Sequence, residues 1–400
     1  QGIFSSRKLE KASVELIPMR YICGNLSPDH DTIATFRQRF IEEIKPLFTQ
    51  VLAICRKMGH LKLEYMSVDG TKIKADASKH QAMSYAGASR LEERLEAEVE
   101  ELLRRAEEAD RADDAAERMA GDVSIPKELE RREERLKFIR EQKAKLEARA
   151  RERHEKEQAE YEAKLEERRA KEQETGRKSR GKSPKPPKGG PRATDQINFT
   201  DEESRIMPTS GGAFEQAYNA QAAVDVKSRL IVGAHVSQAP NDKEQIEPML
   251  EKITTAREEI GSAEGLLADS GYFSEANVKA CVASKITPYI ARKRTRHHYS
   301  IEDLLGAGSD RQTDPQCASD HGEEQDAVRA MEDRMQSRAG RALYAHRKST
   351  IEPVFGIAKR ALGFRQFSLR GLKKVEGEWN LVCMAMNIKR MHVLIVQSAN

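Results

Sequence analysis

Three acidic residues, Asp69, Asp269 and Glu352, stand where their carboxylates could hold a metal ion. We expect Asp69 and Asp269 to end strands, and Glu352 to begin a late helix that packs across the same sheet edge. Hard cations such as Mg²⁺ bind a few carboxylates together with substrate phosphates. Two such ions about 3.5–4 Å apart can activate the attacking oxygen and stabilise the leaving one in a phosphodiester displacement. Three acids beside a basic surface would therefore suit DNA cleavage.

Each acid also has a purely structural interpretation. Asp269 could cap the turn at Ser270-Gly271, because Asp favours local hydrogen bonds in turns. The pair Asp69-Gly70 between alternating segments is a hairpin signal. Glu352 closes the sequence Ser349-Thr350-Ile351-Glu352, which has the form of a capping box. Taken one at a time, the residues leave both interpretations open.

The elements around the acids indicate a sheet flanked by helices. The segment AFEQAYNAQAAVDVKSRLIVGAHVSQ predicts two strands, at 217–225 and 229–237. The segment that follows has an apolar helical face, with Asn241 or Asp242 as the expected cap. The other expected elements are a strand ending at Asp269, a helix near 274–284, a strand in ITPYIAR and a polar loop over 296–335. This order predicts a mixed α/β sheet.

A long, highly charged segment interrupts this pattern between residues 88 and 175. Two heptad frames of apolar residues run through it: Leu95, Val99, Leu102, Ala106 and Ala109, then Leu129, Leu136, Ile139 and Leu146. The sequence AGDVSIP between the frames breaks the helix, and Ser124 is placed to cap the second half. We therefore expect an antiparallel helical hairpin. A basic flexible linker at 176–197 follows, which could contact phosphates or simply be solvated.

The N-terminal segment, residues 1–62, predicts a small helical module in which Ser27 or Asp31 caps a helix. Its basic residues would suit DNA binding, or they could form a solvated helix face. The chain begins at Gln1 without a methionine, in sequence typical of the middle of a domain. We therefore expect that an N-terminal fragment is missing.

The C-terminal segment has the best nucleic-acid footprint of the chain. Phe364 and Phe367 are interleaved with basic residues, which is typical of a nucleic-acid surface. The basic residues are Lys359, Arg360, Arg365, Arg370, Lys373 and Lys374. Glu352 and Lys359 lie seven residues apart, which places them on the same face of a helix.

Composition excludes several classes of protein. Charged residues make up 34% of the 400 residues and aromatic residues only 5%, so much of the chain must be solvated helix or disorder. The five cysteines form no CxxC pair, which argues against a zinc site or a disulfide framework and fits a reducing cytosol. No apolar stretch is long enough to span a bilayer, and no signal peptide is visible.

Four blocks of the sequence resemble the DDE transposases of bacterial insertion sequences, in that family's order. The blocks are SVDGTKIKADASKH, AYNAQAAVDVKSRLIVGAHVSQAPNDK, LLADSGYFSEAN and RKSTIEPVFGIAKRALGFRQFSLRGLKKVEGEWNLV. The resemblance covers nearly the whole chain and implies an RNase H-like α/β fold. In this chain we expect a mixed sheet flanked by helices, interrupted by an antiparallel coiled-coil insertion of the kind that some members of the family carry, and preceded by a partial all-helical N-terminal module.

The patterns along the chain, taken together with the resemblance, predict the division of the chain into domains. The expected parts are an N-terminal helical, DNA-binding module at 1–62, the first part of the RNase H-like catalytic domain at 63–87, the helical hairpin at 88–175, the basic linker at 176–197, and the remainder of the catalytic domain with basic C-terminal helices at 198–400.

The family implies a catalytic triad that falls here on Asp69, Asp269 and Glu352. These residues would bind two Mg²⁺ ions, for which Mn²⁺ could substitute. Lys359 matches a family lysine that is expected to contact DNA near the cut.

One family element is shifted in this chain. Many related transposases place a tyrosine and an arginine seven and four residues before the glutamate, whereas Tyr344 and Arg347 here each sit one place earlier. We count Arg347 among the expected DNA contacts, together with the six basic residues of the C-terminal segment.

The implied activity is strand cleavage at the element ends, which frees 3′-hydroxyls that then attack target DNA. The expected partners are double-stranded DNA of the element ends and the target, and further copies of the chain in a homodimer or higher oligomer on that DNA. No membrane partner is expected, and the protein would act in the bacterial cytoplasm at the nucleoid. The alternative is a non-catalytic, DNA-binding remnant of a transposase.

Overall fold

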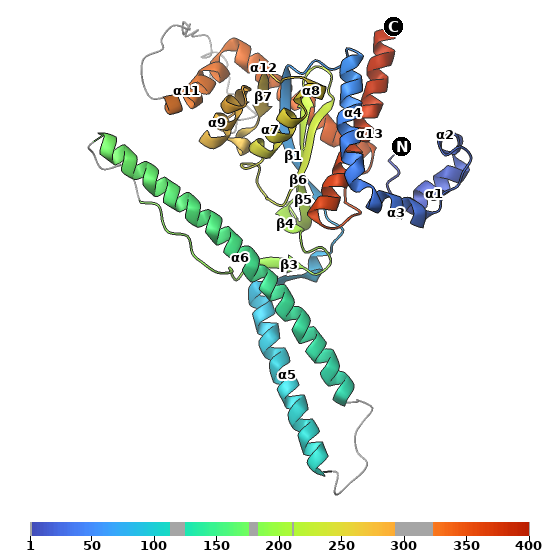
Figure 1. The fold of residues 1–400 in the computed structure, drawn as a ribbon, viewed down its shortest axis with the longest axis vertical. Coiled ribbons are helices and arrows are strands. Elements are labelled where there is room, and N and C mark those ends of the chain that lie inside the picture. The colour runs from blue at the N-terminus through green and yellow to red at the C-terminus, as the bar shows by residue number, and fades with distance from the viewer. Residues whose placement is uncertain (1, 113–124, 176–182, 210–211, 293–322, 400) are drawn as a thin grey trace. The chain divides into compact units, whose positions relative to one another are not determined.

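The computed structural model describes residues 2–112, 125–175, 183–209, 212–292 and 323–399. The chain divides into two compact units, Gln1–Ala77 with Glu203–Asn400 and, separately, Ser78–Glu202. The first unit contains a mixed sheet, and the second contains two long helices (Figure 1).

A six-stranded mixed sheet forms the centre of the first unit. Its strands are β1 (Tyr65–Lys74), β4 (Arg205–Pro208), β5 (Phe214–Asp225), β6 (Ile231–Ser237), β7 (Gly265–Ala268) and β8 (Thr287–Ile290). The central strand β1 pairs antiparallel with β5 and parallel with β7, and β7 pairs parallel with β8. Both β4 and β6 pair with the other side of β5. The predicted RNase H-like mixed sheet is confirmed.

The strands on either side of β1 differ in length, and this difference shapes one edge of the sheet. β5 pairs with β1 from Met66 to Lys74, whereas β7 pairs with it only from Tyr65 to Ser67. Because β7 ends at Ala268, the middle of β1 pairs with no strand on that side among the described residues, and only Lys74 at its end bridges to Gln366. The carboxyl end of β7 therefore opens beside the middle of β1.

Helices cover both faces of the sheet (Figure 1). Helix α7 (Ile246–Thr255) packs on the face that carries Gly233, where an added Cβ would lie 2.7 Å from the sulfur of Met249. Helix α12 (Arg338–Gly356) packs on the opposite face, over β1, β5 and β7. The other helices of this unit are α1 (Ser6–Glu15), α2 (Ile17–Ile22), α3 (His30–Arg39), α4 (Ile41–Lys57), α8 (Arg257–Ile260), α9 (Glu275–Ala283), α11 (Glu323–Gln336) and α13 (Leu372–Ala399), with a π-helical turn at Ile357–Ala361.

Trp379, the single tryptophan of the chain, ties α13 to the sheet. Its side chain is fully buried, and its indole N–H donates a 2.9 Å hydrogen bond to the carbonyl of Gln221 in β5. Its ring also stacks on Phe355 of α12, with ring centroids 6.4 Å apart. These contacts fix α12 and α13 against the sheet.

Three details of the expected elements are wrong. The N-cap of α3 is Asp29, whose carboxylate accepts from Thr32 N–H, rather than Ser27 or Asp31. Helix α7 begins after Gln245, so neither Asn241 nor Asp242 caps it. Part of the expected polar loop is the helix α11; the rest of that loop, at 296–322, lies outside the described residues.

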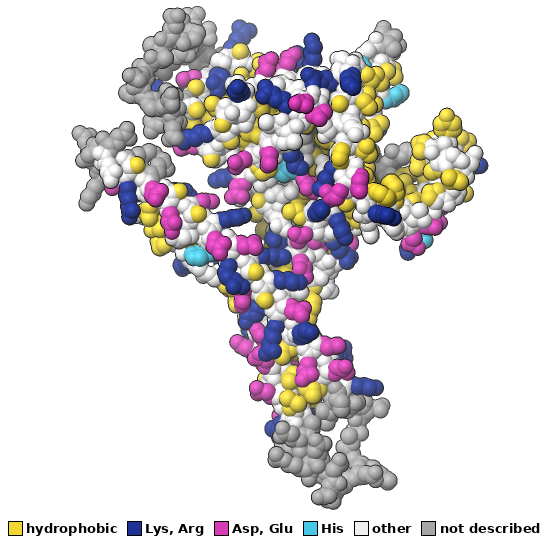
Figure 2. Space-filling model, viewed as in Figure 1, with side chains coloured by type: hydrophobic (Ala, Val, Ile, Leu, Met, Phe, Trp, Pro, Cys, Tyr) yellow, Lys and Arg dark blue, Asp and Glu magenta, His cyan; other side chains and the backbone are white. Residues whose placement is uncertain are grey.

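The second unit is a helical hairpin with a short antiparallel ribbon of β2 (Ala82–Ser84) and β3 (Gln196–Asn198). Helices α5 (Tyr85–Ala112) and α6 (Ile125–Thr175) pack through a seam of Ala88, Leu95, Leu136 and Ile139. The pairing of Arg132 with Glu98 at 3.0 Å and of Arg140 with Glu92 at 3.1 Å shows that the helices are antiparallel. Figure 2 shows both charges mixed along this unit. Ser124 and residues 176–182 lie outside the described residues.

Within the described residues, none of the helices is both long and apolar enough to cross a membrane.

Candidate active site

Asp69 lies inside strand β1 and not at its end, contrary to our expectation. Its neighbour Gly70 also lies within the strand, so the hairpin interpretation of this pair is wrong. The carboxylate is largely buried, with 22% of the side chain exposed. One oxygen accepts a 2.8 Å hydrogen bond from the N–H of Gly70, and the other lies 3.3 Å from Nη1 of Arg347 in α12.

Asp269 directly follows β7, as the sequence predicts. Its backbone is extended, with φ −81° and ψ −179°, so it continues the direction of the strand. Because Ser67 pairs with Leu267, Asp69 and Asp269 each lie two residues beyond this pair and project from the same face. Neighbouring strands are roughly 4.8 Å apart. The fold therefore brings these two aspartates side by side.

Asp269 also caps the turn that follows it. Its Oδ1 accepts a 2.8 Å hydrogen bond from the N–H of Gly271. The structural interpretation of this residue is therefore correct, but the cap uses only one of the two carboxylate oxygens. The second oxygen remains available for a ligand.

The surroundings of Asp69 disfavour a negative charge in the absence of a cation. Burial, together with the carboxylates of Asp269 and Asp242, raises the pKa of Asp69 to about 6, against the opposing effects of the Gly70 N–H and Arg347. A divalent cation would offset both the burial and the repulsion between the acids. The chemistry of this donor set fits a hard metal ion.

Glu352 lies near the end of α12, and its side chain is exposed. The capping-box interpretation is wrong, because α12 begins at Arg338 with Ser337 as its N-cap; for the same reason Glu352 does not begin a helix. Among the described residues, no group of three His, Cys, Asp or Glu side chains has an arrangement that could hold a metal ion. The structure thus brings Asp69 and Asp269 together, without Glu352.

Helix α12 brings two other residues to the aspartates. Arg347 is buried against Asp69, so its guanidinium faces this site. Burial raises the pKa of Tyr344, and Asp269 and Asp69 raise it further. Tyr344 and Arg347 lie three residues apart, a spacing that puts both on one helix face.

The predicted DNA-contacting residues are in several different environments. Lys359 is half-buried and donates a 2.8 Å hydrogen bond to the carbonyl of Lys72, and burial lowers its pKa. Arg370 pairs with Asp76 at 2.9 Å, and Lys373 lies 3.4 Å from a carboxylate oxygen of Glu42. The remaining members, Arg360, Arg365 and Lys374, are exposed.

The two aromatic residues of this segment do not form a base-stacking surface. Phe364 and Phe367 are each only 1% exposed, and their rings pack edge to face in the core. The aromatic part of the predicted nucleic-acid surface is therefore wrong, and only its charges remain available.

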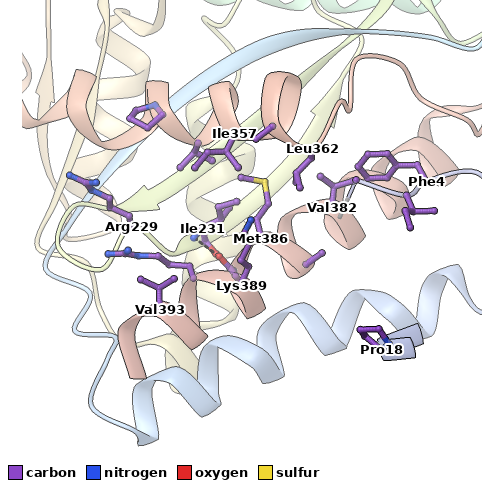
Figure 3. A pocket seen from close by; sticks show the side chains of 18 of the residues that line it. Phe4, Pro18, Arg229, Ile231, Ile357, Leu362, Val382, Met386, Lys389 and Val393 are labelled. Carbon is purple, nitrogen blue, oxygen red and sulfur yellow. Dashed lines mark hydrogen bonds between the residues drawn. The ribbon is translucent and has the colours of Figure 1, made fainter. Parts of the chain in front are cut away.

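A separate pocket of about 670 Å³ lies between the N-terminal segment and the helices α12 and α13 (Figure 3). Its lining is mainly apolar and includes Phe4, Ile231, Val382 and Met386. Such a lining offers few oxygen ligands, so this pocket is not a candidate metal site.

Comparison with known proteins supports the same assignment. A family model described as a transposase DDE domain matches residues 192–388, and a second model, described as a transposase domain, matches residues 1–39. Together the two matches cover more than half of the chain. The chain belongs to the DDE transposases of bacterial insertion sequences. Searches of curated proteins and of solved structures found no match.

DDE transposases act on DNA with divalent metal ions, and the site described above fits this chemistry. Asp269 and Glu352 fall within the matched DDE domain, while Asp69 lies outside both matched ranges. The assignment of Asp69 to this transposase site therefore depends on its position beside Asp269.

The raised pKa of Asp69 predicts that metal binding depends on pH. Below about pH 6 a proton competes for this carboxylate, so the affinity for Mn²⁺ should fall roughly tenfold per pH unit. In the metal-free protein, the folded state binds a proton on Asp69 more tightly than the unfolded state does. The contribution of Asp69 to the free energy of unfolding should therefore decrease as pH rises from about 4 to about 6. Calorimetric titration and thermal unfolding across this range would measure both effects.

Asp69→Asn is the control for this prediction, because the variant lacks the titrating group. An affinity that stays constant in the wild type between about pH 5 and pH 7 would contradict the role of Asp69 as a ligand.

Proposed function

We propose that this transposase cleaves DNA strands at the ends of its element and transfers them into target DNA through Asp69, Asp269 and Glu352. The observation that carries the proposal is the meeting of Asp69 and Asp269, from strands about two hundred residues apart in the sequence, at the carboxyl end of β7. In open α/β sheets this end of the strands is where ligands bind.

The chain's own residues divide the task between them. Asp69 and Asp269 would hold the divalent cations, for which we propose two Mg²⁺ ions with Mn²⁺ as a substitute. When bound, such a pair of ions would activate the attacking oxygen and stabilise the leaving one. Arg347 neutralises Asp69 in the metal-free protein and keeps α12 over the site.

Glu352 is the proposed third ligand because it lies on α12, the helix that packs over β1 and β7. Its carboxylate is exposed and forms no ion pair among the described residues. Two other acids of the C-terminal segment are already engaged. Glu376 lies 2.5 Å from Nζ of Lys252, and Glu378 accepts hydrogen bonds from backbone N–H groups.

The experiment that tests the proposal is a cleavage assay on a double-stranded DNA that carries the element end, with Mg²⁺ or with a chelator. The expected result is metal-dependent nicking that leaves a 3′-hydroxyl. The alternative function, a non-catalytic DNA-binding remnant, predicts binding of the same DNA without cleavage in either condition.

We further propose that the basic C-terminal residues bind the DNA backbone, and that Arg347 and Lys359 lie near the cut strand. The protein would act at the bacterial nucleoid. Two element ends must be joined, so two or more copies of the chain would assemble on the DNA.

Replacing Arg365, Arg370, Lys373 and Lys374 with alanine should weaken DNA binding and reduce its salt dependence. Each lost phosphate contact should lower the slope of log affinity against log salt by about one unit, because fewer counterions are released. Fluorescence anisotropy at several salt concentrations would measure this slope. The matched control replaces four exposed basic residues of α6: Arg131, Arg135, Lys137 and Lys156. Equal slopes in the two variants would show that the C-terminal charges have no specific role.

A further inference from the structure

A buried hydrogen-bonded cluster surrounds Gly70 in β1. The strand register pairs Gly70 with Gln221 and Lys72 with Asn219, so these side chains share one face of the sheet. Asp242, in the loop after β6, accepts hydrogen bonds on Oδ1 from the amides of Asn219 and Gln221, both at 2.7 Å. The ammonium of Lys72 lies 3.6 Å from the same oxygen. Asp242 is therefore held in place by two amide donors and by an ion pair with Lys72.

Glycine at position 70 is what lets this carboxylate approach the strand. An added Cβ would lie 2.1 Å from Nε2 of Gln221 and 2.8 Å from Oδ1 of Asp242. Oδ1 of Asn219 would lie 2.9 Å from the same point, and this oxygen is buried without a hydrogen-bond donor in the described part of the chain. Asp242 thus reaches the backbone immediately after Asp69.

The second oxygen of Asp242 is turned toward the turn that follows β7. Oδ2 lies 3.9 Å from the position of an added Cβ on Gly271, whose N–H is the one that Asp269 caps. Among the described residues, no donor forms a hydrogen bond with this oxygen. The Asp242 carboxylate therefore stands between the backbone of β1 and the turn that holds Asp269.

Charge around the site is not balanced. Of the three neighbouring aspartates, Asp69 has Arg347 at 3.3 Å and Asp242 has Lys72 at 3.6 Å. Asp269 forms no ion pair with any residue that the structure describes. The excess negative charge favours a hard cation at this position.

We propose that Asp242 is an additional anionic residue of the cation site, whose charge strengthens the binding of the divalent cation held by Asp69 and Asp269. This inference rests on the proposed function, because it takes these two aspartates as ligands. Oδ1 fixes the carboxylate through the amides of Asn219 and Gln221, and its charge acts on the site through space, from the face of β1 opposite to the one that carries Asp69.

The test is a calorimetric titration of the full chain with Mn²⁺ in the absence of DNA. Asp242→Asn keeps the Oδ1 acceptor, and with it the bonds to the two amides, but it removes the charge. Affinity for Mn²⁺ should fall by about tenfold or more, which is the range found when groups that support metal ligands are replaced. Thermal unfolding of the metal-free variant should stay close to that of the wild type.

A second variant has the opposite expected sign and keeps the inference testable if Asp242→Asn does not fold. Lys72→Gln removes the ammonium that neutralises Asp242. The affinity for Mn²⁺ should then rise several-fold, because the cation no longer competes with a fixed positive charge. A fall in affinity, or no change, would overturn the inference.

The matched control is Asp225→Asn, at a buried aspartate that accepts hydrogen bonds from Ser228 in the turn after β5. Its Mn²⁺ affinity should equal that of the wild type.

Loss of binding in Asp269→Asn together with full binding in Asp242→Asn would overturn the inference and leave the proposed function intact. Full binding in Asp269→Asn would overturn the proposed function, and the inference with it.

Discussion

Asp269→Asn should reduce Mg²⁺-dependent cleavage of the element end on the order of a thousandfold, while the fold is retained. A metal ligand acts through its negative charge, which contributes several kcal/mol to transition-state stabilisation, and each 1.36 kcal/mol is roughly tenfold in rate. Asparagine keeps the oxygen that caps Gly271, so the turn after β7 should remain formed. Single-turnover cleavage on saturating DNA would measure the loss.

Asp225→Asn serves again as the control, since it makes the same chemical change at a buried aspartate outside the site. The DNA-bound fraction should be determined in parallel, so that a binding defect is not mistaken for a chemical one. Cleavage by Asp269→Asn within about tenfold of the wild-type rate would exclude this carboxylate as a ligand.

Glu352→Gln should cause a comparable loss of cleavage, roughly a thousandfold, with no change in thermal stability. The exposed side chain lies within α12 and caps no helix, so the structure gives it no role in stability that glutamine would lose. A defect in cleavage with unchanged stability and DNA binding would therefore report the chemistry. Glu251→Gln, at an exposed glutamate of α7, is the matched control.

Retained cleavage in Glu352→Gln would mean that the third ligand lies elsewhere. Glu376 and Glu378 would be the next acids to replace, although both are engaged in the metal-free structure. Asp242 would then also become a candidate for direct metal binding.

Local sequence patterns predict most of the fold. The alternating segments mark β5 and β6, and the apolar run before Asp269 marks β7, because burial on a strand or helix repeats with a fixed period. The heptad frames likewise predict the helical hairpin, whose seam buries Leu95 and Leu136. The boundaries of the five proposed domains stay a prediction.

Tertiary contacts determine the features of the site that the sequence does not predict. Asp69 lies in the middle of a strand because β5 extends β1 beyond the end of β7, which no local pattern records. Asp242 has the sequence signature of a helix cap, but Asn219 and Gln221 on β5 bind it instead. Phe364 is interleaved with charges in the sequence, yet it packs inward. In each case the deciding partner is distant in the chain.

The place of the helical hairpin between β1 and β5 has a consequence for the order in which the protein folds. β1 leaves the ribosome first among the sheet strands, and β5 begins only at Phe214. At about 5–20 residues per second, β1 would wait roughly seven to thirty seconds for its partner. During this time α5 and α6 can pair through local contacts, and the β2–β3 ribbon closes the base of the hairpin by pairing Ala82 with Asn198. The hairpin then replaces a long flexible loop with a short effective one, so the entropy cost of joining β1 to β5 is lower.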